Sequence, residues 1–502
     1  MIPSSFTQGV WGKSWEEARG DNAVQGTANL GDEGVVLDIP CGKLLGSPGV
    51  VINGEKELSA AEYLYGFSQD GYALVLGNAV YSGGETRYPG MVHQVIRADY
   101  LMAAKGCREF DPSNVINRVD IEVRNLADWY GKSAYCMTFD SDDQDNMRFR
   151  ALEYKKENDE AAVLLESEQC SITLFSKYII PGLNVNEMTF RHQCCLKVCF
   201  SAGKTLEEAR DFAVKLSEFL SLCMGFHAAI QRFTLYFDGE ESAIQYYAPL
   251  IDSPTPSKNA VRAMPFPYRA LEREIGNYLS SWFDYGIDRR DKEDYLLLKR
   301  AGDLIVSILT YDWKMPVELQ CVSASQALEA ISRYRADLQS WPKAVFKQNR
   351  KELLKRTEGM PEEFVAWIQS RIGQNSKGAK RLINELMDRQ KDVVGWLVPD
   401  IDKFVSEQQV ARNTYSHGSA AAAVDPSNLY RLTMGTALLC YAILWRLFGM
   451  CPTQIRRELE RSHFKSWVID WLSVQYQSQD LVDASESDED GDSDCSGRAS
   501  DI

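Results

Sequence analysis

The stretch Asp252-Ser253-Pro254-Thr255-Pro256-Ser257, continued by Pro265-Phe266-Pro267, divides the chain at the point where the spacing of its apolar residues changes. It holds four prolines and little apolar periodicity, which predicts a linker. Before it, apolar residues alternate with a period of two; after it, they recur three and four positions apart. The predicted fold class is therefore α+β: a β-rich domain at 1–251, a Pro-rich linker at 252–267, an all-α domain at 268–476 and an acidic tail at 477–502.

The β-rich domain is indicated by short alternating runs separated by Gly, Asn, Asp and Pro, a pattern typical of antiparallel sheets. Clear runs lie at 35–39, 72–76, 118–123 and 171–175. Near the end of the domain, Thr205-Leu206-Glu207-Glu208 has the form of a capping box, which predicts a helix through about Met224. A last strand is expected at 233–237.

The second domain is indicated by segments with helical periodicity. They lie at 268–283, 295–309, 323–338, 344–356, 362–372, 379–397, 402–415 and 429–447. The longest uncharged apolar stretch, the 14 residues between Arg431 and Arg446, is too short to span a bilayer and predicts a buried helix. No secretory signal is visible at Met1, so a cytoplasmic location is expected, with no membrane partner.

Charge is distributed unevenly along the 502 residues, whose formal net charge is −16. Residues 1–262 carry 24 basic and 36 acidic side chains, residues 263–479 carry 30 and 26, and residues 480–502 carry 1 and 9. The helical region is therefore weakly basic, which is compatible with nucleic acid as a partner. The tail has too little apolar surface to offset the cost of ordering and is expected to be disordered.

Most sequence signatures of cofactor and metal chemistry are missing: there is no GxGxxG after a strand, no HExxH, no GxSxG and no phosphate-binding loop. No cofactor and no metal site are predicted. The cluster of His192 with Cys194, Cys195 and Cys199 lies in a strand-like pattern and is interpreted as core. A second cluster resembles the acidic and Glu-x-Lys pattern of restriction-type, metal-dependent nucleases and stays open as an alternative; it comprises Asp140, Asp142, Asp143, Asp145, Glu153 and Lys155.

The candidate catalytic motif is Arg412-Asn413-Thr414-Tyr415-Ser416-His417, at the end of a predicted helix. Of the five histidines, only His417 has an arginine five residues before it. RNA carries its own nucleophile, the 2′-hydroxyl, so a metal-free ribonuclease needs a group that moves a proton and a cation that stabilises the phosphorane. Histidine titrates near pH ~6.5 and arginine offers a planar fork of donors, so the pair suits both tasks.

The motif resembles the R-x(4–6)-H signature of HEPN domains, in the variant where a polar residue follows the arginine. The start of the chain also resembles the N-terminal domain of ApeA-like abortive-infection proteins, through Phe6-x-x-Gly9-x-Trp11, Val24-x-Gly26, the 35–39 strand, Asp128-Trp129 and the helix at 216–225. The resemblance implies a HEPN endoribonuclease that acts in antiphage defence, with Arg412, Asn413 and His417 as site residues. It also implies a homodimer through the HEPN domain, RNA (structured RNA such as tRNA) as substrate, and a phage-derived trigger.

Other residues are assigned supporting roles. Related HEPN domains often carry an acidic residue at the helix position of Glu329, and Tyr415 is either core or a platform for a base. A basic helix suited to phosphates comprises Lys343, Lys347, Arg350, Lys351, Lys355 and Arg356. Two alternatives to a HEPN ribonuclease remain open: a non-catalytic HEPN module that binds a nucleotide or a partner, and a metal-dependent nuclease at 140–155.

Overall fold

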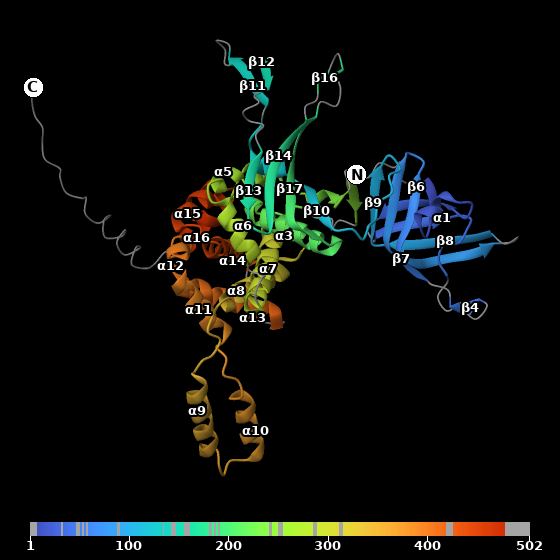
Figure 1. Cartoon of the computed structure of the whole chain (residues 1–502). Helices are drawn as coiled ribbons and strands as arrows, with labels where there is room; N and C mark the ends of the chain where they lie inside the picture. Colours follow the sequence, from blue (N-terminus) through green and yellow to red (C-terminus); the bar gives the residue numbers. More distant parts are fainter. Residues whose placement is uncertain are drawn as a thin grey trace, which may run out of the picture. The chain divides into compact units, whose positions relative to one another are not determined.

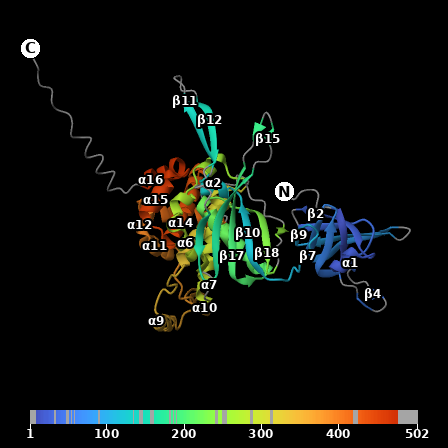
Figure 2. The same cartoon turned by 45° about the horizontal axis from the view of Figure 1, so that its top comes forward.

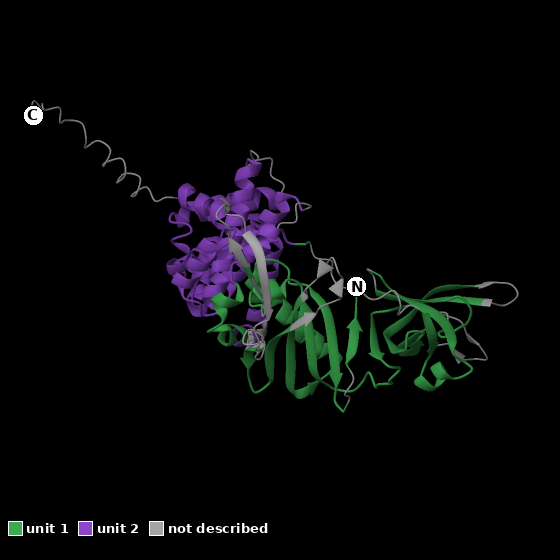
Figure 3. Cartoon of the chain, turned by 90° about the horizontal axis from the view of Figure 1, so that it is seen from above, with its two compact units in different colours: residues 1–255, 267–279 green, residues 256–266, 280–502 purple. Residues whose placement is uncertain are grey.

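The computed structural model divides the chain into two compact units, which are described separately: residues 1–255 with 267–279, and residues 256–266 with 280–502 (Figure 3). The residues that the structure describes are 8–31, 34–46, 51–52, 55–56, 59–87, 91–133, 135–141, 147–154, 161–179, 183–184, 187–188, 191–239, 243–248, 255–284, 289–310, 315–417 and 425–476. The predicted disordered tail, 477–502, lies outside these residues.

The first unit begins with a closed antiparallel barrel. Its strands are β1 (Gln8–Gly12), β2 (Val24–Gly31), β3 (Gly34–Ile39), β6 (Ala60–Ser68), β7 (Tyr72–Arg87) and β8 (Met91–Ala98). They pair in the order β7-β6-β1-β2-β3-β8, and β8 pairs back with β7, which closes the ring. Trp11 lies fully buried in the core. It faces Gly66 across the sheet, where a Cβ would come within 2.6 Å of the indole ring, so only glycine fits there.

The barrel sheet continues through β9 (Tyr100–Lys105) into a second group of strands. They follow β9 in the order β19 (Ile244–Tyr247), β18 (Ile230–Phe237), β10 (Ile116–Val123), β17 (Arg191–Lys204), β14 (Cys170–Ile179) and β13 (Ala162–Glu166), as Figure 2 shows for β10, β17 and β18. Helix α3 (Leu206–Met224) packs against β10 and β17. The predicted capping box is present, since the Thr205 hydroxyl accepts from Glu208 N–H and the Glu208 carboxylate accepts from Thr205 N–H.

Short elements complete this unit. They are α1 (Trp15–Arg19), α2 (Leu126–Tyr130), α5 (Tyr268–Leu271) and the ladders β4 (Val51–Ile52) with β5 (Glu55–Lys56), β11 (Tyr135–Ser141) with β12 (Met147–Tyr154), and β15 (Leu183–Asn184) with β16 (Glu187–Met188). In the predicted linker, residues 258–262 form α4 (Lys258–Arg262), and Phe266 is fully buried. After the linker, α5 is followed by helix α6 (Ile275–Asp284).

The second unit is helical. It contains α7 (Arg289–Leu309), α8 (Val317–Arg333), α9 (Lys343–Arg356), α10 (Glu362–Arg371), α11 (Ala379–Arg389), α12 (Lys391–Val394), α13 (Ile401–His417), α14 (Pro426–Leu447), α15 (Pro452–Arg461), the π-helical turn η3 (Lys465–Ile469) and α16 (Asp470–Gln475). Helix α14 forms the core and packs against α7 and α8. Helix α8 also contacts α11 and α13, so it connects the core to the helix that carries the Arg412 motif.

The predicted fold class, a β-rich region followed by a helical one, is confirmed. Three predicted helices differ in detail. The 323–338 helix ends at Arg333, because Tyr334 leaves the helical region at ψ 120°. The 379–397 helix divides at Gln390 (φ −111°, ψ 19°) into α11 and α12. The 268–283 helix divides into α5 and α6.

Candidate active site

Arg412 and Glu329 form the centre of the candidate site. Arg412 Nη2 lies 3.1 Å from Glu329 Oε1, and Arg412 Nη1 donates to Asn413 Oδ1 at 3.1 Å. The side chain of Arg412 is 36% exposed and that of Glu329 is 23% exposed. The guanidinium is therefore held between two oxygens while part of it remains open to solvent, where an anion can reach its donors.

The ion pair lies one helical turn beyond a buried polar contact between the same two helices. Gln408 Nε2 donates to Ser325 Oγ at 2.6 Å, and the Ser325 hydroxyl donates to Cys321 O at 2.8 Å. Both steps, from Ser325 to Glu329 and from Gln408 to Arg412, are four residues along their helices. Helices α8 and α13 therefore run in the same direction, and the buried contact sets the height at which Arg412 meets Glu329.

His417 is the last residue of α13. Its side chain lies outside the described residues, as do residues 418–424 after it. The helix continues through Ser416, so five helical steps place the Cα positions of Arg412 and His417 about 140° apart around the axis. The helical backbone alone does not bring the two positions to one face.

The other predicted site residues have different surroundings. Asn413 is exposed beside Arg412, and Tyr415 is half-buried on α13. The six basic residues of the predicted phosphate-binding helix all lie on α9 and are all exposed. Helices α9 and α10 extend together away from the body of the helical unit (Figure 1). The structure thus brings Glu329, Arg412 and Asn413 together, and places the basic residues on a separate projection.

The sequence holds two clusters of potential metal ligands: the His192 and Cys194 cluster, interpreted as core, and the Asp140–Lys155 cluster, left open as an alternative. In β17, Cys194 is buried, and its Sγ lies 3.5 Å from His192 Nε2 and 3.8 Å from Ser176 Oγ. Burial raises the pKa of the Cys194 thiol to about 11, which opposes the thiolate that a metal needs. Within the described ranges, no group of three or more His, Cys, Asp or Glu side chains could hold a metal ion. The Asp140–Lys155 cluster lies outside the residues whose side chains are described.

Sequence reasoning missed Ser325 and Gln408. A signal for them exists, since each lies four residues before a predicted site residue on the same helix, Glu329 and Arg412 respectively. Residue type gives no further signal, because both lie among other polar residues: Ser323 and Gln326 flank Ser325, and Glu407 and Gln409 flank Gln408.

Comparison with known proteins finds two family models that match the chain. Residues 8–282 match the model of ApeA N-terminal domain 1, and residues 322–450 match that of the Apea-like HEPN domain. The second match includes Glu329, Arg412 and His417. No curated protein and no solved structure matches the chain. Among the described residues, no helix has the length and apolar composition needed to cross a membrane. The chain belongs to the ApeA family, with an ApeA N-terminal domain followed by an ApeA-like HEPN domain.

Proposed function

We propose that the protein is a metal-independent HEPN endoribonuclease of antiphage defence, acting in the cytoplasm by abortive infection. The observation that carries the proposal is the partly exposed Arg412, which lies on the helix that ends at His417 and is ion-paired to Glu329 of α8. His417 takes the proton of the ribose 2′-hydroxyl, and the 2′-oxygen attacks the phosphorus as the bond to the 5′-oxygen breaks. The leaving 5′-oxygen takes a proton from water, and Arg412 donates to the non-bridging phosphate oxygens. Asn413 orients Arg412. The products are a 2′,3′-cyclic phosphate and a 5′-hydroxyl, and DNA is not cleaved.

Glu329 has a specific part in this mechanism. A lone arginine side chain samples many rotamers, and its ion pair with Glu329 restricts the guanidinium to one of them. The carboxylate occupies one Nη atom at 3.1 Å, and the Asn413 carbonyl accepts from the other. An RNA phosphate that enters the site then competes with Glu329 and Asn413 for an Arg412 guanidinium that is already in position.

The test is cleavage of labelled RNA in EDTA by the full chain, with the 3′ ends of the products analysed. Wild type is expected to cleave and to leave cyclic phosphate, and Arg412→Ala and His417→Ala to lose activity at least about a hundredfold. Arg456→Ala is the matched control, because Arg456 is also ion-paired to a glutamate, Glu460, but on α15. Folded, dimeric Arg412→Ala and His417→Ala proteins that cleave like wild type would refute the assignment. Loss of wild-type activity in EDTA would favour a metal-dependent nuclease at Asp140–Lys155. RNA binding without cleavage would favour a non-catalytic HEPN module.

The proposal includes a homodimer through the helical unit, in which the motifs of two copies face one cleft. Because Arg412 and His417 lie about 140° apart on the helix, a second copy provides a way to complete the site. Mixing Arg412→Ala and His417→Ala chains tests this. If each cleft uses the arginine of one copy and the histidine of the other, the mixed dimers regain activity; a site made within one chain gives mixtures no more active than either variant.

We also propose that the basic residues of α9 bind the phosphates of the RNA. Helix α9 carries six basic side chains and one acidic one, Glu352, and all of the basic ones are exposed. Phosphate contacts of this kind are independent of base sequence and weaken with salt. The structured RNA of the proposal, such as tRNA, presents such phosphates in both its helical and its looped parts.

A further inference from the structure

Helices α9 and α10 form an arm, residues 341–372, that has no buried apolar core of its own. Neither helix contains a buried residue. Large apolar side chains are exposed along it: Trp341 at 52%, Phe364 at 44% and Trp367 at 55%. A helical hairpin with so little buried surface gains little from folding alone, and exposed aromatic groups on a projection are typical of a binding surface.

The base of the arm, in contrast, is firmly attached. Asn375 bonds to both backbone groups of Trp341: Trp341 N–H donates to Asn375 Oδ1 at 3.1 Å, and Asn375 Nδ2 donates to Trp341 O at 2.7 Å. An antiparallel bridge joins Gln339 and Ser376. The arm is therefore held at a defined position where it leaves the helical unit.

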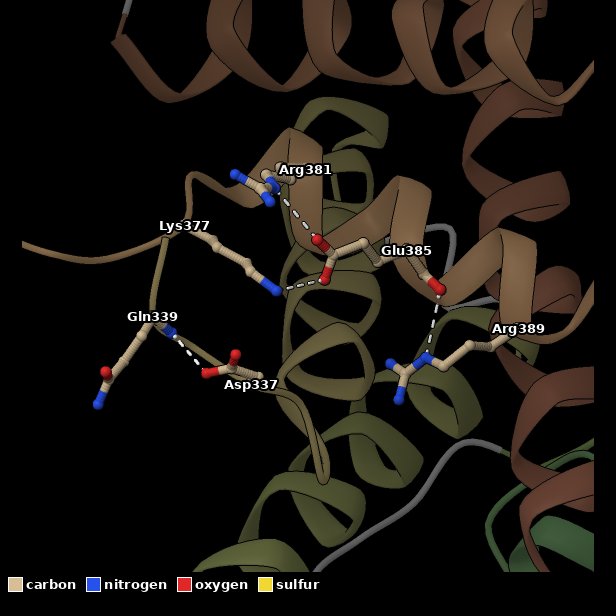
Figure 4. A network of polar contacts seen from close by, with 6 residues as sticks. All are labelled: Asp337, Gln339, Lys377, Arg381, Glu385 and Arg389. Carbon is tan, nitrogen blue, oxygen red and sulfur yellow. Dashed lines mark hydrogen bonds and ion pairs between the residues drawn. The ribbon is translucent and has the colours of Figure 1, made fainter. Parts of the chain in front are cut away.

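A charged network connects this base to α11. Lys377 Nζ lies 2.8 Å from Glu385 Oε2, and Arg381 Nε lies 3.1 Å from Glu385 Oε1, so both cations reach one carboxylate (Figure 4). The hydrogen bond from Lys377 is the main cause that lowers the pKa of Glu385. Lys377 N–H also donates to Leu338 O on the other strand of the base. The base thus stays ordered while the arm presents its surface.

The arm combines two chemistries. Lys343, Lys347, Lys351 and Lys355 recur every four residues and form one stripe along α9. On α10, the rings of Phe364 and Trp367 stack with centroids 5.7 Å apart and an interplanar angle of 22°. The arm therefore carries a basic stripe on one helix and exposed aromatic rings on the other. Proteins hold single-stranded nucleic acid with these two kinds of group, because the cations follow the backbone and unpaired bases stack on the rings.

We propose that the arm binds unpaired nucleotides of RNA, with bases stacked on Phe364, Trp367 and Trp341 and phosphates along the lysine stripe. This inference rests on the proposed function and narrows its substrate class to RNA with an accessible single-stranded segment, such as a loop. Bases within a duplex are stacked on one another and offer no free face to the aromatic pair. RNA is favoured over an arm-to-arm contact with a second copy of the chain, because α9 carries a net charge of +5 and two such stripes repel each other.

The test measures binding of a short, unstructured RNA and of the same sequence as a duplex, by fluorescence anisotropy. All proteins are full-length and carry His417→Ala, so that the RNA stays intact. Phe364→Ala/Trp367→Ala is expected to weaken single-strand binding at least about tenfold and to change duplex binding little. Leu296→Ala, which removes a 51% exposed side chain from α7, is the matched control and is expected to bind as the parent does.

A second variant, Lys347→Ala/Lys351→Ala, tests the phosphate track. Its slope of log affinity against log salt concentration is expected to fall by roughly 1.4, which is about 0.7 for each lost phosphate contact. Unchanged single-strand affinity in the aromatic variant would overturn the proposal. So would a change of oligomeric state in sedimentation without a change in RNA affinity, which would assign the arm to contacts between copies.

The outcomes separate this inference from the proposed nuclease activity. If the aromatic variant in a chain with native His417 cleaves RNA with wild-type KM and kcat, the arm proposal fails and the nuclease stands. If wild type binds single-stranded RNA through the arm but never cleaves it, the nuclease fails and the arm proposal stands.

Discussion

Helices α14 and α10 belong to the same unit but are used in opposite ways. In α14, every residue from Leu432 to Trp445 is buried, and Trp445 is 0% exposed. In α10 no residue is buried, and Trp367 is 55% exposed. Both helices carry a tryptophan, so the presence of a large apolar side chain alone does not distinguish them. The difference lies in whether the rest of the chain covers those side chains, and it separates residues that hold the unit together from residues that remain available to a partner.

The candidate site lies between these extremes. Gln408 and Ser325 are buried, whereas Arg412 and Glu329, one turn further along the same two helices, are only partly covered. The polar contacts between α8 and α13 thus change from buried to partly solvent-exposed within one helical turn. Three of the predictions below compare a residue in the rest of the helical unit with a matched residue of the arm.

The largest effect is expected from the two tryptophans. Trp445→Ala removes a fully buried ring and is expected to lower the free energy of unfolding by about 3–5 kcal/mol. Trp367→Ala is expected to change it by about 0.5 kcal/mol or less, because the ring is mostly in water. Urea unfolding followed by far-UV circular dichroism measures both. If Trp445→Ala yields no folded protein, Ile443→Val, at about 0.5–1.5 kcal/mol, replaces it. Equal losses at the two tryptophans would show that the arm belongs to the core.

Much of the architecture could be predicted because its signals are local. The period of apolar residues changes at the linker, the capping box at Thr205 and Glu208 marks one helix start, and the apolar run of α14 predicts its burial. Helix ends that have no signal in the sequence could not be predicted. Tyr334 and Arg335 end α8 with no glycine or proline, and Arg335 takes φ +48°. Helix α11 stops at Gln390, although the apolar period continues into buried Val393 and Val394.

The candidate site was predictable to a similar degree. The spacing of Arg412 and His417 is a local signal, and the position of Glu329 came from the resemblance to HEPN domains. The hydrogen bond between Ser325 and Gln408 joins residues 83 positions apart. Such a contact depends on how two helices pack, and the four-residue spacing within each helix does not predict which partner either residue meets. The barrel pairings of β1 with β6 and of β3 with β8, which join strands distant in sequence, and the exposure of the arm depend on tertiary structure in the same way.

A smaller effect is expected at the buried hydrogen bond. Gln408→Ala removes the donor to Ser325 and is expected to cost about 1–3 kcal/mol of unfolding free energy. The control is Gln348→Ala, on the exposed surface of α9, with an expected change of about 0.5 kcal/mol or less. Gln408→Ala is also expected to lower RNA cleavage, because it loosens the helix pair that positions Arg412. Wild-type stability in this variant would contradict the structural role of the contact.

A half-buried histidine of the helical unit is expected to make stability depend on pH. His463 is half-buried, its Nδ1 lies 3.1 Å from Ala263 O, and desolvation lowers its pKa below the ordinary value. The unfolded chain therefore binds a proton that the folded chain resists, so this contribution to stability is present above about pH 6.5 and is lost as pH falls below it. The slope for one proton is at most about 1.4 kcal/mol per pH unit.

His463→Asn tests this contribution, since its side-chain amide can replace the Nδ1–H donor but does not titrate. Urea unfolding of both proteins between pH 7 and pH 5 is expected to show a shallower loss of stability in the variant, with similar values near neutral pH. Parallel pH dependences for the two proteins would show that other groups carry the acid sensitivity.

The smallest effect on stability is expected at the ion pair itself. Glu329→Gln weakens a contact to Arg412 that solvent partly screens, so it is expected to cost about 1 kcal/mol or less. Glu352→Gln is the control in the arm: its partner Arg356 is 75% exposed, and the expected change is close to zero. The rate of RNA cleavage is expected to differ between the two variants more than the free energy of unfolding does. Of the two glutamates, Glu329 contacts the proposed catalytic arginine and Glu352 does not. A reduced kcat with nearly native stability would show that the ion pair serves to position Arg412; a large loss of stability with unchanged kcat would make it a structural contact.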